Sequence, residues 1–204
     1  MINHPMTRVL IISLIVFSTS IFSQSKNNME IATFGTGCFW CTEAIFDRLE
    51  GVTEVLPGYS GGEESNPNYK LICSGTTKYA EIVQIKFNPE VITFDELLEI
   101  FWSIHNPTTL NRQGADVGPQ YRSVIFYHNQ IQKEKAELYK QKLMDAKVWE
   151  NPVVTEISPF VSFYKAEKEH LDFYKNNPAN GYCSFVITPK VEKFEKVFSD
   201  KLKK

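Results

Sequence analysis

β-Prone segments alternate with helical segments along most of the chain, and this alternation restricts the possible folds more than any other feature of the sequence. A parallel strand pair needs a crossover of about a dozen or more residues, whereas some connections between the predicted strands are short. The pattern therefore favours an α+β fold, a two-layer α/β sandwich with a mixed sheet, over a fully parallel sheet.

The predicted elements follow the periodicity of the apolar residues. Strands are expected over residues 31–34, 52–59, 79–87, 121–127, 153–157 and 186–188. Helices are expected over residues 39–49, 66–75, 93–106, 130–146, 165–175 and 191–202. Asn66 is the expected N-cap of the second helix, with Pro67 at its first position, and Thr93 with Glu96 forms a capping box for the third. Residues 106–120 lack apolar periodicity, and a loop of that length is usually functional.

We expect residues 30–204 to form a single catalytic domain with a C-terminal helical tail. The composition of the chain is that of a globular protein. The chain is 43% hydrophobic, which is far from the composition of disordered proteins. Its formal net charge is −2, and both signs are scattered along the sequence. Nucleic-acid binding is therefore not expected, because it needs Lys and Arg clustered on one face.

The first 23 residues have the order of a secretory signal peptide. Arg8 supplies a positive charge, an apolar run covers residues 9–17, and small residues follow at 18–20. The run is too short to span a bilayer comfortably, which takes about 20 residues. We expect cleavage after Ser23, a polar spacer over residues 24–29, and export, to the periplasm if the source is bacterial. An uncleaved leader would instead anchor the protein to a membrane.

Cys38 and Cys41 stand where a predicted strand gives way to a helix. A thiolate at a helix N-terminus is stabilised by the free N–H groups, so we expect a lowered pKa for Cys38. The spacing brings both sulfurs into one helical turn, where they can form a disulfide. Three interpretations fit the pair alone: a reactive thiol site, a thioredoxin-type centre or half a zinc site. Zinc would need two further ligands at suitable spacing, which we do not find, so no metal is expected.

A series of motifs, in the same order, closely resembles peptide methionine sulfoxide reductase A. The resemblance runs from about residue 30 to residue 183, and several motifs together make it specific. The motifs are Gly37–Trp40, Gly58–Gly62, Asn66–Tyr69, Cys73–Gly75, Ala80–Glu81 and Gln113–Ser123.

The resemblance implies a reaction and a pocket. Cys38 attacks the sulfur of methionine S-sulfoxide, free or in oxidised proteins, and Glu81 protonates the sulfoxide oxygen. The resemblance gives the other pocket residues these roles: Tyr69 and Tyr121 hold that oxygen, Phe39 and Trp40 enclose the S-methyl group, and Asp116 is a polar residue of the same pocket. The fold is then expected to be a ferredoxin-like plait, and the protein a monomer.

The chemistry makes sense of these residue types. A carboxyl group with a raised pKa can protonate a poor leaving oxygen, and phenol hydroxyls can stabilise the charge on it. Attack leaves methionine and a sulfenic acid on Cys38. A second thiol then closes a disulfide, which an external dithiol such as a thioredoxin-like protein reduces, so no bound cofactor is needed. The expected role is the repair of oxidised proteins; general thiol–disulfide exchange is the alternative.

The second thiol is the open part of this assignment. The family usually has Gly where this chain has Cys41, and some members use a Cys in a C-terminal Gly-Tyr-Cys, which occurs here at Cys183. We favour Cys41 as the resolving cysteine because the helix fixes its distance from Cys38, and keep Cys183 as the alternative. Cys73 lies in a predicted helix and is expected to be buried and unreactive.

Overall fold

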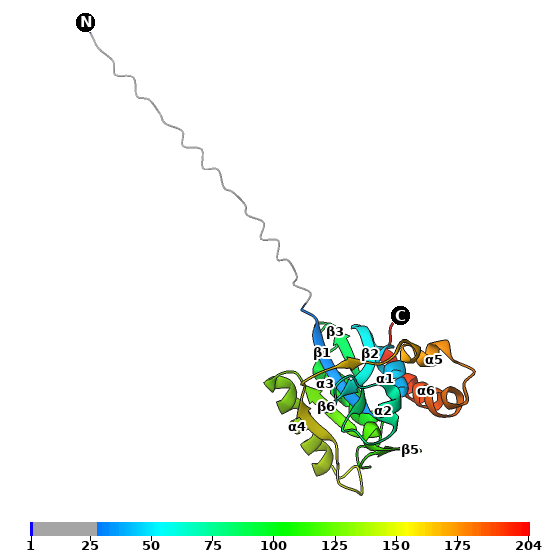
Figure 1. The fold of residues 1–204 in the computed structure, drawn as a ribbon. Coiled ribbons are helices and arrows are strands. Elements are labelled where there is room, and N and C mark those ends of the chain that lie inside the picture. The colour runs from blue at the N-terminus through cyan, green and yellow to red at the C-terminus, as the bar shows by residue number, and fades with distance from the viewer. Residues whose placement is uncertain (2–27) are drawn as a thin grey trace.

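A mixed sheet runs through the centre of the molecule (Figure 1). The structure is a computed structural model that describes Met1 and residues 28–204. Within that part of the chain, six strands form one sheet in the order β7-β6-β1-β3-β2-β8. Their bounds are β1 (Glu30–Thr36), β2 (Val52–Ser60), β3 (Ala80–Phe87), β6 (Ser123–Tyr127), β7 (Glu156–Pro159) and β8 (Tyr164–Lys165). The predicted signal peptide and residues 24–27 of the predicted spacer lie outside the described residues.

The helices and short turns alternate with the strands. The α-helices are α1 (Phe39–Phe46), α2 (Tyr69–Cys73), α3 (Phe94–Ser103), α4 (Gln130–Asp145), α5 (Phe173–Asn176) and α6 (Thr188–Val197). The other turns are the 3-10 helices η1 (Pro119–Tyr121), η2 (Lys168–His170) and η4 (Ser199–Lys201), and the π-helix η3 (Cys183–Ile187). A small hairpin pairs β4 (Arg112–Gln113) with β5 (Asp116–Val117). In the described residues, no helix is both long and apolar enough to cross a membrane.

The pairing confirms a mixed sheet in an α/β fold. Strand β1 pairs antiparallel with β3 and β6, and β2 pairs antiparallel with β3 and β8. Only the pairing of β6 with β7 is parallel in the described sheet, and α4 lies in the connection between them. That connection is long enough for a crossover, whereas the antiparallel pairs need none.

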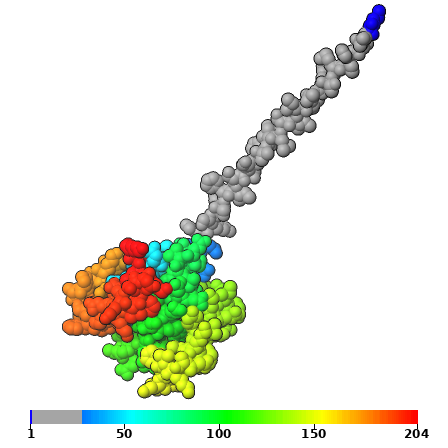
Figure 2. Space-filling view, turned by 180° about the vertical axis from the view of Figure 1, so that it is seen from behind, coloured from blue at the N-terminus to red at the C-terminus, as the bar shows by residue number. Residues whose placement is uncertain are grey.

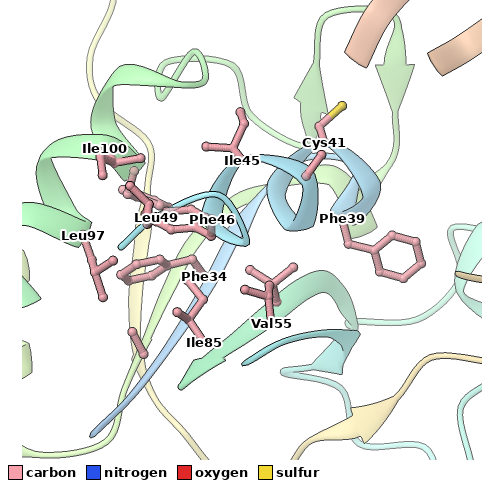
Figure 3. Packing of buried hydrophobic residues seen from close by; sticks show 14 of the residues in the cluster. Phe34, Phe39, Cys41, Ile45, Phe46, Leu49, Val55, Ile85, Leu97 and Ile100 are labelled. Carbon is pink, nitrogen blue, oxygen red and sulfur yellow. The ribbon is translucent and has the colours of Figure 1, made fainter. Parts of the chain in front are cut away.

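The main core lies between one face of the sheet and helices α1 and α3. Figure 3 shows Phe34 of β1 facing Phe46 of α1 and Leu97 of α3. The ring of Phe34 lies 5.7 Å from that of Phe46 and 5.1 Å from that of Phe101. These side chains are fully buried, and each large apolar side chain removed from water contributes about 1.5–3 kcal/mol.

Alternation along β3 divides its side chains between two faces. Ala80 and Ile82 belong to a smaller cluster that packs against Phe160 and Phe163 on the opposite face of the sheet. Val83, Ile85 and Phe87 of the same strand belong to the main core. Because successive side chains of a strand point to opposite faces, Glu81 points towards α1. The position of this acid is therefore decided by strand periodicity.

Two predicted helix starts have different outcomes. The capping box at α3 is confirmed, with Thr93 Oγ1 accepting the Glu96 N–H and Glu96 Oε2 accepting the Thr93 N–H. The start predicted at Asn66 is wrong. Asn66 has a left-handed backbone, with φ of 55°, and the helix begins two residues later, after Asn68, whose side chain accepts the Leu71 N–H.

The C-terminal third differs most from the predictions. The predicted helix over 165–175 is wrong, because Asp172 is left-handed, with φ of 52°, and separates η2 from α5. The predicted extended segment at 186–188 is also wrong, because η3 runs directly into α6. The strand predicted over 153–157 occurs as β7, later in the chain. In the space-filling view the C-terminal residues, orange to red, form one side of the molecule (Figure 2).

Candidate active site

The turn between β1 and α1 places Cys38 at the N-cap of the helix, as the sequence predicts. Gly37 makes the turn with φ of 103°, a conformation that glycine tolerates and other residues avoid. A Cβ atom at Gly37 would also lie 2.6 Å from Cβ of Gln113. The chain therefore leaves the sheet sharply, and the Cys38 side chain is buried with 7% of its surface exposed.

Glu81 lies across from Cys38 on β3. It is 1% exposed, and its Oε2 accepts the Phe39 N–H at 3.1 Å. Burial raises the pKa of Glu81 to about 8, although the hydrogen bond from Phe39 opposes that shift. The carboxyl group is therefore mainly protonated at neutral pH and can act as a proton donor.

A cavity of about 200 Å³ joins the two residues. Its lining contains all seven residues that the sequence predicts for the acid, nucleophile and substrate positions, together with Tyr182: Cys38, Phe39, Trp40, Tyr69, Glu81, Asp116, Tyr121 and Tyr182. Cys41 and Cys183 are buried but do not line this cavity. The sequence missed Tyr182 as a pocket residue, although its motif Gly-Tyr-Cys was the available signal.

The hydroxyl groups of Tyr69 and Tyr121 remain protonated. Burial raises the pKa of both phenols, and the charge of Glu81 adds to the shift. Tyr69 is the first residue of α2, and its backbone N–H donates to Glu167 Oε1 at 2.8 Å. Tyr121 ends η1, just before β6. Two neutral O–H donors therefore face the same small cavity as the protonated acid.

Asp116 connects the β4–β5 hairpin to the C-terminal segment. Its Oδ2 accepts a hydrogen bond from the Tyr182 hydroxyl at 2.6 Å. The two residues are 66 positions apart, so only the tertiary structure brings them together. Tyr182 thereby closes one side of the cavity, and Asp116 orients its hydroxyl group.

The aromatic wall is held by residues that the sequence did not identify. Trp40 stacks on Phe173, with ring centroids 3.7 Å apart and an angle of 8° between the planes. The Trp40 Nε1–H donates to Nδ1 of His170 at 3.2 Å, and His170 packs on Tyr69 at 4.4 Å. Glu167, which accepts the Tyr69 N–H, also accepts a hydrogen bond from the Tyr59 hydroxyl at 2.9 Å. This network fixes the wall that Phe39 and Trp40 present to the cavity.

The expected lowering of the Cys38 pKa is wrong in direction. Burial raises the pKa of Cys38 well above its usual value, and its hydrogen bond to Cys41 and the charges of Cys41 and Glu81 add to the shift. The Phe39 N–H, which could have stabilised a thiolate, donates to Glu81 instead. In the resting protein Cys38 is therefore a thiol.

Cys41 has the lower pKa of the pair. Its pKa falls to about 7, first because Cys38 donates a hydrogen bond to it and also because the Lys190 ammonium lies nearby. The Lys190 Nζ is 3.8 Å from Cys41 Sγ. The Lys190 ammonium therefore favours the thiolate form of Cys41.

The other two cysteines also differ in their surroundings. Cys183 is fully buried at the start of η3. Cys73 is exposed, so the expectation that it is buried is wrong. It lies at the end of the short helix α2, where its thiol contacts the Tyr69 hydroxyl. Among the described residues, no group of three His, Cys, Asp or Glu side chains could hold a metal ion.

A protein with this sheet and this thiol–carboxyl pocket is a cysteine-dependent oxidoreductase. The family model "Peptide methionine sulfoxide reductase" matches residues 30–202. The chain belongs to this family, and it is an oxidoreductase that reduces methionine sulfoxide. The family assignment favours sulfoxide reduction over general thiol–disulfide exchange.

Named relatives and solved structures agree with the family. The "Peptide methionine sulfoxide reductase MsrA" of Saccharolobus solfataricus is 54% identical over 175 residues, covering 86% of this chain and 98% of the relative. That of Sulfolobus acidocaldarius is 56% identical over 177 residues, covering 85% and 97%. The reduced form of Mxr1 from Saccharomyces cerevisiae is 37% identical, with a TM-score of 0.69 and coverage of 76% and 89%. Methionine sulfoxide reductase A of Corynebacterium diphtheriae is 34% identical, with a TM-score of 0.68 and coverage of 76% and 78%.

Proposed function

We propose that this protein reduces the S-epimer of methionine sulfoxide, free or in oxidised proteins, through a sulfenic acid on Cys38. The observation that carries the proposal is the cavity shared by the Cys38 thiol and the Glu81 carboxyl group, whose pKa is about 8. A small cavity of about 200 Å³ suits the end of one side chain and leaves the rest of a protein substrate outside.

In the first step the sulfoxide oxygen moves from the methionine sulfur to the cysteine sulfur. Glu81 protonates the oxygen, while the hydroxyls of Tyr69 and Tyr121 orient it and stabilise the charge that develops on it. Cys38 gives up its proton to the Cys41 sulfur, which already accepts its hydrogen bond, and attacks the sulfoxide sulfur. The products are methionine and the sulfenic acid, so atoms and electrons balance.

Phe39 and Trp40 form the apolar part of the substrate site. Phe39 is 1% exposed, and Trp40 is fixed by its stack on Phe173. Such a wall suits the S-methyl group and excludes water from the reacting sulfur. Asp116 contributes through Tyr182, whose hydroxyl it holds at the edge of the cavity.

In the second step we propose that Cys41 closes a disulfide with Cys38, in a Cys-x-x-Cys variant of the family. Support comes from the hydrogen bond between the two sulfurs and from the low pKa of Cys41. Cys183 remains the alternative resolving cysteine. Peptide mapping after one turnover without reductant tests the choice, and a Cys38–Cys183 linkage would contradict it.

A thioredoxin-like dithiol is the proposed external reductant, and the protein needs no bound cofactor. Support comes from the solved structure of yeast Mxr1 in complex with Trx2, which is 28% identical to this chain with a TM-score of 0.50. We further propose that the enzyme acts as a monomer in the repair of oxidised proteins. From the leader, we propose export to the periplasm with cleavage after Ser23, or a membrane anchor if the leader stays.

We also propose that the central sheet is a ferredoxin-like plait. Four adjacent strands have the order β6-β1-β3-β2, and each is antiparallel to its neighbours. Helix α1 connects β1 to β2, and α3 lies between β3 and β6, so two helices accompany four strands as the plait requires. Strands β7 and β8 then extend the sheet at its two edges.

The test is methionine release from each epimer of a peptide methionine sulfoxide, with dithiothreitol as reductant. We expect release from the S-epimer alone, and loss of release in Cys38→Ser. Reduction of insulin disulfides, measured in parallel, reports general thiol–disulfide exchange. Equal activity on both epimers, or disulfide exchange without methionine release, would overturn the proposal.

A further inference from the structure

Helix α6 brings a lysine to the second thiol of the site. Lys190 Nζ lies 3.8 Å from Cys41 Sγ, and Cys41 is 5% exposed on α1. The two residues are 149 positions apart, so the contact depends on the packing of the C-terminal helix on α1. Among the described residues, no carboxylate forms an ion pair with Lys190, and its ammonium group is free to act on the sulfur.

The groups around Cys41 have opposing effects on its charge. Cys38 at the start of α1 lowers the pKa of Cys41, and so does the Tyr182 hydroxyl from just before η3, although that hydroxyl donates its hydrogen bond to Asp116. Burial and the charge of Asp116 on β5 disfavour the thiolate, and the Cys183 thiol also lies within electrostatic reach. Among these groups Lys190 is the one cation that the structure describes next to the sulfur.

We propose that Lys190 is a positioning residue that holds Cys41 as a thiolate next to Cys38, ready to close the disulfide. The proposal rests on the proposed sulfenic acid chemistry at Cys38 and extends it to the second step. An ammonium group about 4 Å from a buried sulfur favours the anion strongly, because little water screens the pair. The same contact also orients the Cys41 sulfur, because the ammonium group at the end of the Lys190 side chain lies next to it.

The step balances without any further reagent. Cys41 gives up the proton that it accepted from Cys38 in the first step, and its thiolate, which the Lys190 ammonium favours, uses an electron pair to form the S–S bond with the sulfenic sulfur of Cys38. The S–O bond of the sulfenic acid breaks, and the leaving hydroxide takes up the proton released by Cys41 and becomes water. The sulfenic sulfur of Cys38 is reduced and the Cys41 sulfur is oxidised, and the disulfide carries both.

Lys190→Met and Lys190→Gln test the proposal, with Lys190→Arg as the charge-preserving variant. Lys193→Met is the matched control, because Lys193 is an exposed lysine of the same helix and, within the described residues, Lys190 rather than Lys193 forms the hydrogen bond to Cys41. Each full-length protein is mixed with one equivalent of substrate at a series of pH values. Disulfide formation is followed by quenching, and the sulfenic acid is trapped with dimedone.

In the neutral variants we expect the pH midpoint of disulfide formation to rise from about 7 towards the usual value of about 8.5. A complete return to about 8.5 would lower the thiolate fraction at pH 7 roughly fifteenfold and, because a more basic thiolate is also more nucleophilic, the rate about threefold. These are upper limits, because Cys38 still lowers the pKa of Cys41 in the variants. Dimedone-trapped sulfenic acid accumulates accordingly. Lys190→Arg keeps the midpoint near that of the unchanged protein, whereas a purely structural role would change the melting temperature without moving the midpoint.

Two results would overturn the proposal. One is an unchanged midpoint in both neutral variants, and the other is a Cys38–Cys183 disulfide with Cys41 left free. Failure of the proposed function is seen separately, because the unchanged protein would then release no methionine in the first turnover.

Discussion

Glu81 is the residue whose environment most directly sets the chemistry of the pocket. A carboxylic acid is usually ionised at neutral pH, but Glu81 lies beneath α1 with 1% exposure, and its pKa rises to about 8. Cys38 also stays protonated, because burial and the nearby charges disfavour its thiolate. The resting site therefore keeps a proton on both groups, next to Cys41, whose pKa is lowered to about 7 by Cys38 and Lys190.

The pH dependence of methionine release tests the role of Glu81. Above pH 8 the carboxyl group loses its proton, so the first-turnover rate should fall as pH rises through about 8. Glu81→Gln should lower the rate by about 10²–10⁴ and remove this descending limb while substrate still binds. Glu99→Gln, on the exposed side of α3, is the control and should keep the limb. A descending limb that persists in Glu81→Gln would contradict the assignment.

At the scale of elements, the turn between β1 and α1 connects the sheet to the reactive thiol. Gly37 has a positive φ, and its α-carbon faces Gln113, whose side chain bonds the backbone of Asn106 through both of its polar atoms. The loop that carries Asn106 therefore packs directly against the catalytic turn. Residues 106–120, which lack apolar periodicity, are therefore held against the turn by hydrogen bonds such as these.

Gly37→Ala should be more harmful than Gly114→Ala. Both glycines have positive φ, at 103° and 62°, so each substitution strains the backbone by about 1–2 kcal/mol. Only the alanine at Gly37 would also collide with Gln113, which adds about 1–3 kcal/mol of overpacking. Urea unfolding measures the difference, and methionine release should be lost only in Gly37→Ala. Equal losses of unfolding free energy in both variants would show that the turn tolerates a side chain.

At the scale of the whole molecule, the C-terminal segment is attached to α1 through a buried acid. Glu43 is 4% exposed, and its Oε1 accepts the Asp172 N–H at 2.9 Å. Burial raises the pKa of Glu43 to about 7. This hydrogen bond holds the left-handed Asp172, and His170 and Phe173 on either side of it contribute to the aromatic wall. The wall therefore depends on a contact with α1 that lies outside the cavity.

Glu43→Ala should loosen that segment. The Asp172 N–H would lose its partner, which costs about 1–3 kcal/mol of unfolding free energy. Amide hydrogen exchange over residues 170–176 should become faster, and KM should rise more than kcat falls. Glu195→Ala removes the partly exposed ion pair with Arg48 at the same side of the molecule and should cost at most about 1 kcal/mol. Unchanged exchange in Glu43→Ala would contradict this role.

The sequence by itself determined the features that depend on neighbouring residues. Strand alternation puts Glu81 on the helix side of the sheet, the capping box starts α3, and glycine before Cys38 allows the sharp turn. These signals act over a few residues, so periodicity and backbone preference reveal them. The family motifs added the residues that line the cavity, which the structure brings together.

Only the tertiary structure decided the protonation of the thiols and the course of the C-terminal segment. Burial outweighs the helix N-terminus at Cys38, and burial depends on what packs above the residue. Lys190 reaches Cys41 from 149 positions away, and the predicted helix is interrupted at the left-handed Asp172, whose N–H donates to Glu43. Such contacts join segments that are distant in the sequence. Local propensity does not predict them, because the contacts stabilise the protein only once the segments have packed together.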